Sequence, residues 1–139
     1  MMYLFTPILA WLIAGTMKYC INYMRFGNGA KSLIGNGGFP SNHTTIVSSA
    51  AMLIGFEEGF NTPIFTLGIA ITIIVIIDAT GLRRHVGYHA QHINLLMHEA
   101  NYKKLRERMG HTKFEVLGGL ALGSVLAYLI HIVINGTFL

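Results

Sequence analysis

Residues 63–79 read PIFTLGIAITIIVIIDA, and Asp78 is the only charged side chain in this run. Isoleucine, leucine, valine and phenylalanine make up most of it. A helix needs roughly 17 to 25 mostly apolar residues to cross a bilayer, because the hydrocarbon core is about 30 Å thick. The segment therefore predicts a transmembrane helix, which sets the class of the whole protein.

Three other apolar segments, residues 3–24, 44–56 and 114–134, extend this prediction along the chain. Hydroxyl residues between Thr44 and Ser49 interrupt the second of them, as is typical of helices that pack against other helices. Gly119 and Gly123 form a small-xxx-small pair in the last, which also indicates close helix packing. We predict one all-α domain over residues 1–139, a membrane bundle of about four transmembrane helices.

The composition agrees with a membrane protein. Hydrophobic residues make up 53% of the chain and charged residues 12%, with a mean hydropathy of +0.52; soluble domains carry about 25% charged residues. The pI is near 9.4, but the basic residues lie between apolar spans, so we expect no nucleic-acid partner. Cys20 is the only cysteine, which excludes a disulfide framework. No basic segment precedes Tyr3, so the first run predicts a retained helix rather than a signal peptide.

The connections between the apolar runs differ in charge. The first holds Arg25 and Lys31, the second holds Glu57 and Glu58, and the third holds Arg83, Arg84, Lys103, Lys104, Arg106, Arg108 and Lys113. The positive-inside rule places the first and third connections in the cytoplasm, with both chain ends outside, as expected in a cell (inner) membrane. Apolar residues at helical spacing between Val86 and Met109 predict an amphipathic helix on the inner membrane surface. We interpret the basic run 103–108 as a lipid-facing charge patch.

Four polar clusters border the two basic connections. They are Lys18 with Arg25, then residues 37–43 (GGFPSNH), residues 78–85 (DATGLRRH) and residues 110–115 (GHTKFE). If helix packing brings them together, cations from several helix ends meet two histidines. Such a group repels itself unless an anion occupies it, and phosphate suits these side chains.

Residues 37–43 add a backbone element to this site. Gly37 and Gly38 lead into Pro40 and Ser41, where a helix is predicted to begin. The first amides of a helix are unpaired and carry the positive end of its dipole, so they can cradle a phosphate. His43 then lies in the first turn, where it can protonate a leaving alkoxide as a general acid.

The pair His111 and Glu115 supplies a nucleophile. The two residues are four apart and share one helix face if a helix begins near Gly110. A carboxylate bonded to one imidazole nitrogen leaves the other nitrogen basic, so the imidazole can attack phosphorus. Cationic side chains can stabilise the phosphoryl oxygens, so no metal is required. Alternatively, Thr112 and Glu115 form a capping box, and the carboxylate serves the backbone.

These motifs together resemble the type 2 phosphatidic acid phosphatase and vanadium haloperoxidase superfamily, whose signatures are K-x6-R-P, P-S-G-H and S-R-x5-H-x3-D. The matching stretches are Lys18-x6-Arg25 with Phe26 in place of proline, Pro40-Ser41-Asn42-His43 with Asn42 in place of glycine, and His111-x3-Glu115 with glutamate in place of aspartate. The chain is most similar to a divergent branch of that superfamily, whose members carry GGMPSSH, DATGVRRH and LGHTPxEV. The likeness covers nearly the whole chain.

The resemblance implies a role for each matching position. Phosphate is bound by Lys18, Arg25, Ser41 and one of Arg83 and Arg84, beside the glycine cradle at Gly38; His43 is the acid, His111 the nucleophile and Glu115 its orienting partner. Asp78 is expected to orient one of these arginines from behind the phosphate-binding residues. The usual six spans of the superfamily are reduced to about four, which is compatible with a homodimer.

The expected activity is hydrolysis of a lipid phosphate monoester or polyprenyl (pyro)phosphate at the cytoplasmic membrane face, with no cofactor. The substrate would be a membrane lipid, because the chain has no room for a soluble recognition domain. Two alternatives remain: a non-catalytic lipid-phosphate-binding protein, and a small transporter that uses its intramembrane lysine and histidine residues. Haloperoxidase activity is a weaker alternative.

His85, His89, His92 and His98 have partial metal-ligand spacing, but no carboxylate or thiolate joins them.

Overall fold

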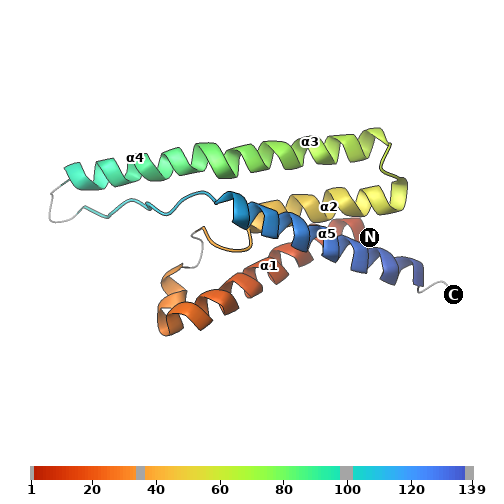
Figure 1. The fold of residues 1–139 in the computed structure, drawn as a ribbon, viewed down its shortest axis with the longest axis horizontal. Helices are drawn as coiled ribbons and strands as arrows, with labels where there is room; N and C mark the ends of the chain where they lie inside the picture. Colours follow the sequence, from red (N-terminus) through yellow and green to blue (C-terminus); the bar gives the residue numbers. More distant parts are fainter. Residues whose placement is uncertain (1, 34–36, 98–101, 137–139) are drawn as a thin grey trace.

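The computed structural model describes residues 2–33, 37–97 and 102–136, and these form helices and connecting segments without a strand. The elements in chain order are α1 (Met2–Phe26), the 3₁₀ turns η1 (Gly27–Leu33), α2 (Asn42–Glu58), α3 (Pro63–Ile77), the π-helical turn η2 (Asp78–Leu82), α4 (Arg83–Leu96) and α5 (Lys113–Gly136). Figure 1 shows α1, α3 and α5 arranged around α2. The all-α prediction is confirmed.

Helix α2 is the centre of the bundle. Its hydroxyl residues are buried, as predicted: Thr44, Thr45, Ser48 and Ser49 are each at most 3% exposed. The glycine pair of α5 packs against them, since a Cβ on Gly123 would lie 2.0 Å from Ser48 Oγ and one on Gly119 would lie 2.7 Å from the Ser41 carbonyl oxygen. Only a residue without a side chain permits this approach, so the two glycines set the distance between α2 and α5.

Among the residues that the structure describes, three helical stretches are long and apolar enough to cross a membrane: Met2–Lys31, Pro63–Leu96 and Lys113–Gly136. Helix α2 has 17 residues and is not among them. The sequence predicts about four spans, and the described residues contain three by length and composition. The difference is α2, which is short and surrounded by its neighbours, so its polar residues face protein.

Helices α3 and α4 form one nearly straight rod through η2 (Figure 1). The joined stretch Pro63–Leu96 has 34 residues, or about 50 Å at roughly 1.5 Å per residue. That length exceeds the roughly 30 Å of a hydrocarbon core, so one end of the rod extends past the apolar region. Helix α4 is more polar than α3, so α4 is the end of the rod that projects beyond the hydrocarbon core.

The amphipathic helix predicted for residues 86–109 is only half correct. Helix α4 ends at Leu96, and Tyr102–Gly110 contains no helix; residues 98–101 lie outside the described residues. We call Tyr102–Gly110 the arm. It runs back beside α4, because the Asn94 side chain accepts from the N–H of Leu105 (2.8 Å) and donates to the Leu105 carbonyl (2.9 Å). These bonds satisfy the N–H and carbonyl of Leu105, which in a helix would bond to other backbone groups.

The two ends of the bundle differ. At one end lie both chain termini and the α2–α3 turn, where Glu57 Oε1 of α2 is 2.8 Å from His131 Nδ1 of α5. At the other end lie η1, the segment before α2, the η2–α4 junction and the arm (Figure 1). All four predicted polar clusters belong to this second end, so the fold brings both basic connections to one face.

Candidate active site

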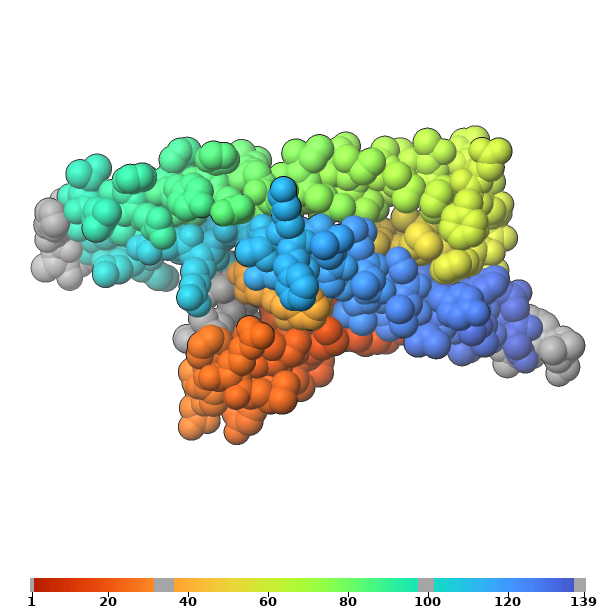
Figure 2. Space-filling view, in the orientation of Figure 1, coloured from red at the N-terminus to blue at the C-terminus, as the bar shows by residue number. Residues whose placement is uncertain are grey.

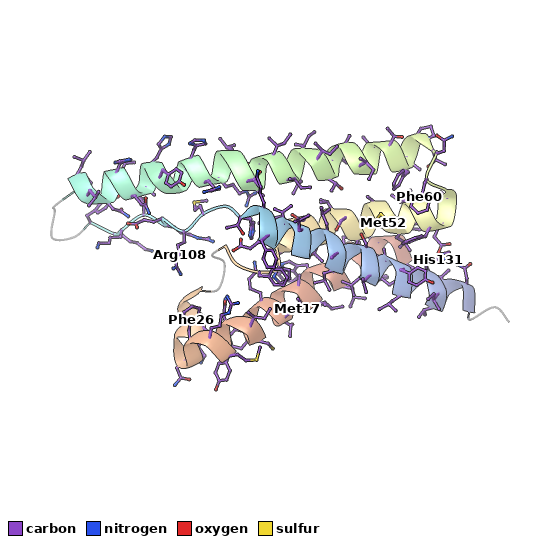
Figure 3. All side chains as sticks on the ribbon, in the orientation of Figure 1. Met17, Phe26, Met52, Phe60, Arg108 and His131 are labelled. Carbon is purple, nitrogen blue, oxygen red and sulfur yellow. The ribbon has the colours of Figure 1, made fainter. Side chains whose placement is uncertain are left out.

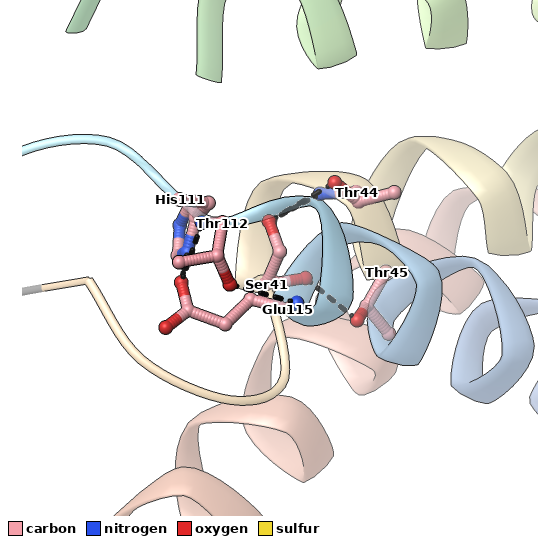
Figure 4. Close-up of polar contacts among 6 residues, drawn as sticks. All are labelled: Ser41, Thr44, Thr45, His111, Thr112 and Glu115. Carbon is pink, nitrogen blue, oxygen red and sulfur yellow. Dashed lines mark hydrogen bonds and ion pairs between the residues drawn. The ribbon is translucent and has the colours of Figure 1, made fainter. Parts of the chain in front are cut away.

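The start of α5 is closed by a reciprocal cap. Glu115 Oε2 accepts the N–H of Thr112 at 3.2 Å, and Thr112 Oγ1 accepts the N–H of Glu115 at 3.3 Å (Figure 4). This is a capping box, which satisfies two otherwise unpaired amides. The same carboxylate oxygen lies 2.9 Å from His111 Nδ1. The two alternative roles of Glu115 thus coexist in one side chain.

The Glu115 contact fixes the tautomer of His111. An ionised carboxylate only accepts hydrogen bonds, so Nδ1 carries the proton and Nε2 keeps its lone pair. The side chain is buried, with 6% of His111 exposed. Burial is the largest cause that lowers the His111 pKa below its ordinary value; the Glu115 hydrogen bond opposes it, and the charge of Lys18 adds to it. The imidazole is therefore neutral near pH 7, as a nucleophile must be.

His43 lies opposite His111 in the first turn of α2. The two ring centroids are 6.0 Å apart with the ring planes at 63°. His43 Nε2 is 3.1 Å from Arg83 Nη1, and Arg83 Nε donates to Asp78 Oδ2. Arginine has donors only, so Nε2 of His43 is the acceptor in this contact. The arginine that Asp78 bonds is therefore Arg83, and the orienting role of Asp78 stays a prediction.

The two neighbouring arginines separate in space. Arg83 turns to His43 and Asp78 at the η2–α4 junction, whereas Arg84 donates from Nη2 to the Tyr88 hydroxyl at 3.2 Å and lines a cavity. Successive helical residues point about 100° apart, so one of the pair must face away from His43. Spacing alone left the pair unresolved, and the fold gives each a different environment.

Ser41 is the N-cap of α2. Its Oγ accepts from the Thr44 N–H (3.4 Å) and the Thr44 hydroxyl (3.0 Å), its N–H donates to the Glu115 carbonyl (2.9 Å), and the residue is fully buried (Figure 4). The Ser41 N–H is thus already used, whereas the hydroxyl accepts in both contacts and keeps its own proton as a donor. The phosphate-binding role of Ser41 stays a prediction.

Two glycines allow three of the clusters to touch. A Cβ on Gly37 would lie 2.5 Å from the Gly110 carbonyl oxygen, and one on Gly110 would lie 2.8 Å from the Ala79 carbonyl oxygen. Gly110 also has a positive φ of 81°, which other residues rarely adopt. Next to it, the N–H of His111 donates to the Ala79 carbonyl at 2.8 Å. Residues 37–43, 78–85 and 110–115 therefore form one continuous site.

A cavity of about 400 Å³ opens beside His111. Its walls include Arg25, Gly38, Arg84, Arg108, His111 and Glu115. Arg108 of the arm and Phe26 at the end of α1, both labelled in Figure 3, lie on two of its sides. In the space-filling view the end of α1 projects from the body of the molecule (Figure 2).

Lys18 lies next to this cavity rather than at a headgroup level outside the protein. It is 8% exposed, and a Cβ on Gly38 would lie 3.9 Å from Lys18 Cδ. A lysine that snorkels to the surface keeps its charged end in water, whereas Lys18 is buried; its phosphate-binding role stays a prediction. Lys18 and Arg25 are seven residues apart, about two helical turns, and so lie on one side of α1.

Arg108 is the charged cavity residue that the sequence motifs did not identify. It belongs to the basic run 103–108, for which the sequence predicts a lipid-facing charge patch. Its one sequence signal is its place close before Gly110 and His111. His85, His89 and His92 are exposed on α4, and within residues 2–33, 37–97 and 102–136 no three His, Cys, Asp or Glu side chains could hold a metal ion. His98 lies outside the described residues.

Comparison with known proteins now gives the chain a family. The model of the Divergent PAP2 family matches residues 1–126, a range that contains all four polar clusters. The chain is 31% identical over 147 aligned positions to YuiD of Bacillus subtilis strain 168, described as an uncharacterized membrane protein, and the match covers 90% of this chain and 93% of YuiD. No solved structure matches the chain. With three candidate spans and a membrane relative, this integral membrane protein belongs to the Divergent PAP2 family.

Proposed function

We propose that this protein is a metal-independent hydrolase of lipid phosphates that acts through a phosphohistidine at His111. The contact between His111 Nδ1 and Glu115 Oε2, on the wall of a cavity lined by arginines, is the observation that carries the proposal. It leaves Nε2 of His111 free to attack phosphorus. Family membership supports the same class of reaction.

In the proposed reaction the cavity holds the phosphoryl group. Arg25 and Arg84 neutralise its oxygens, with Lys18 alongside, and these charges stabilise the transition state. His111 Nε2 bonds to phosphorus as the bond to the leaving oxygen breaks. Glu115 stabilises the imidazolium that results. Water then attacks the phosphohistidine and releases orthophosphate.

The proposed location is the cytoplasmic face of the inner membrane. The site lies at the end of the bundle that carries both basic connections, and basic loops favour the cytoplasmic side. In this arrangement η2 of the α3–α4 rod lies at the same membrane depth as the cavity. A lipid phosphate then reaches the cavity from the inner leaflet without leaving the membrane.

A phosphate-release assay tests the proposal. Purified full-length protein is offered phosphatidic acid, phosphatidylglycerophosphate and undecaprenyl pyrophosphate, with and without EDTA and vanadate. We expect release from at least one lipid, unchanged by EDTA and blocked by vanadate, which mimics five-coordinate phosphorus. Loss of release in EDTA would contradict the mechanism. Equal lipid binding by wild type and His111→Ala, with no release from either, would select a non-catalytic binder instead.

A further inference from the structure

The Asn94 side chain is the point at which the arm is attached to α4. Its Oδ1 accepts from the N–H of Leu105 (2.8 Å) and from the Tyr102 hydroxyl (3.2 Å). Its Nδ2 donates to the Leu105 carbonyl (2.9 Å) and to Glu107 Oε1 (2.7 Å). An asparagine amide has two protons to donate and two lone pairs to accept with, so these bonds use its full capacity. One side chain therefore holds three residues of the arm.

This attachment decides where Arg108 lies. A Cβ on Gly87 of α4 would lie 2.4 Å from the Glu107 carbonyl oxygen, so the arm backbone packs directly on α4 just before Arg108. The Met109 N–H donates to the same carbonyl at 3.0 Å, which closes a three-residue turn centred on Arg108. Arg108, labelled in Figure 3, lies on the wall of the cavity. Its position therefore follows from the contact of the arm with α4.

The bond between Asn94 and Glu107 also affects the charge of Arg108. Glu107 is the only acidic residue of the arm and directly precedes Arg108. A carboxylate and a guanidinium so close readily form charge-assisted hydrogen bonds, yet Arg108 forms no ion pair with an acidic side chain in the described part of the chain. The Glu107 carboxylate is bonded to the Asn94 amide instead. The Arg108 charge is consequently available to an anion in the cavity.

We propose that Arg108 is a further phosphoryl-binding residue and that Asn94 is the positioning residue that holds it at the cavity. This inference rests on the proposed function, because it takes the cavity as the phosphoryl site. Arg108 joins Arg25 and Arg84 on the walls, and a third guanidinium adds charge-assisted hydrogen bonds to the phosphoryl oxygens. Because Asn94 orders the arm before an anion arrives, binding does not have to fix this segment of the chain. Asn94 lies outside the cavity walls and acts only through the arm.

The test measures anion binding directly, by isothermal titration of orthovanadate into the purified full-length protein in detergent. We expect Arg108→Gln to raise the vanadate Kd by about tenfold, because hydrogen bonds to charged groups contribute on that order. Asn94→Ala should raise the Kd by a similar factor, although alanine favours the helix itself more than asparagine does. The double variant should bind about as weakly as Arg108→Gln alone, because the effects of residues that act through one another do not add.

Two control variants separate this effect from a general one. Asn61→Ala makes the same change in the turn between α2 and α3, at the opposite end of the bundle, and Lys104→Gln removes a charge on the arm outside the cavity walls. Neither should change the vanadate Kd by more than about twofold, because isolated exposed groups contribute little. Hydrogen exchange gives a second measurement. The Leu105 amide, which bonds to Asn94, should exchange faster in Asn94→Ala but not in Arg108→Gln.

The possible results separate the two claims. Vanadate binding by Asn94→Ala that matches the wild type, or losses that multiply in the double variant, would overturn the inference and leave the hydrolase intact. Unchanged exchange of the Leu105 amide in Asn94→Ala would also overturn the inference. The expected order of vanadate affinities, in a protein that releases phosphate from no lipid, would overturn the hydrolase and support the anion site. A wild type that neither binds vanadate nor releases phosphate would overturn both.

Discussion

The Nδ1 atom of His111 lies 2.9 Å from the Oε2 atom of Glu115, and this oxygen also accepts the backbone N–H of Thr112. One carboxylate thus closes the first turn of α5 and orients the imidazole. Its position depends on the helix start itself, so the geometry of the nucleophile is part of the fold. The first prediction tests the electrostatic half of this relationship.

Glu115→Gln should move the acid limb of the pH–rate profile to lower pH. Only neutral His111 attacks, so kcat/KM falls as pH drops through the His111 pKa, which burial holds below its ordinary value near 6.5. Glu115 raises that pKa, so its removal lowers the pKa further. The maximal rate should also fall by about 100-fold or more, because the tautomer is no longer fixed. A limb that stayed in place or moved to higher pH would contradict the assignment.

Glu57→Gln is the matched control for this experiment. Glu57 also bonds a histidine, with Oε1 2.8 Å from His131 Nδ1, but at the opposite end of the bundle. The same chemical change there should leave both the acid limb and the maximal rate unchanged, because His131 lies far from the cavity along α5.

Arg84→Gln should weaken vanadate inhibition more than Arg83→Gln does. Arg84 lines the cavity, whereas Arg83 is engaged by His43 and Asp78. Loss of one charge-assisted contact to the anion predicts about a tenfold rise in the inhibition constant for Arg84→Gln. Inhibition curves for the two variants and for Lys104→Gln measure the difference. The opposite order would assign the phosphate to Arg83.

His43→Ala should slow alkyl phosphates more than aryl phosphates. An alkoxide needs protonation as it leaves, and general acid catalysis contributes on the order of 10²-fold or more. A nitrophenolate is stable as an anion, so its release depends less on His43. Turnover of an alkyl and a nitrophenyl phosphate by wild type and variant gives the comparison. An equal loss for both would mean that His43 has a role other than acid.

Gly123→Ala should destabilise the bundle. The added Cβ would lie 2.0 Å from Ser48 Oγ, inside the α2–α5 contact, and overpacking of this kind costs about 1–3 kcal/mol. Gly136→Ala is the control on the same helix, since a Cβ there meets nothing within 4 Å. Thermal unfolding in detergent should show a lower midpoint for Gly123→Ala only. Equal midpoints would mean that the two helices are less tightly packed.

The helical architecture could be predicted from the sequence because long apolar runs form membrane helices and small residues lie where helices pack closely. Residues 63–79 had to form a helix, and the buried hydroxyl residues and glycines of α2 and α5 were expected at helix contacts. The contact between His111 and Glu115 was also expected, but on a helix beginning near Gly110; α5 begins at Lys113, so His111 lies before the helix and the Glu115 side chain reaches back to it.

What the sequence could not give was the path of the third connection. Helical periodicity continued past Leu96, but Asn94 pairs with the backbone of Leu105 and turns the chain into the arm. That tertiary contact has no local signal. The contact brings Arg108 to the cavity. The rotation between successive residues of α4 separates Arg83 from Arg84. The first outcome depends on a contact between distant segments, and the second on which side of α4 faces His43 of α2.

The most direct test of the account is to trap the covalent intermediate. Protein mixed briefly with a lipid phosphate substrate is quenched in alkali, where phosphohistidine survives, and its peptides are analysed by mass spectrometry. We predict a phosphoryl group on His111 in the wild type, none in His111→Ala, and no turnover by that variant. Phosphorylation at another residue, or full turnover by His111→Ala, would contradict the central claim.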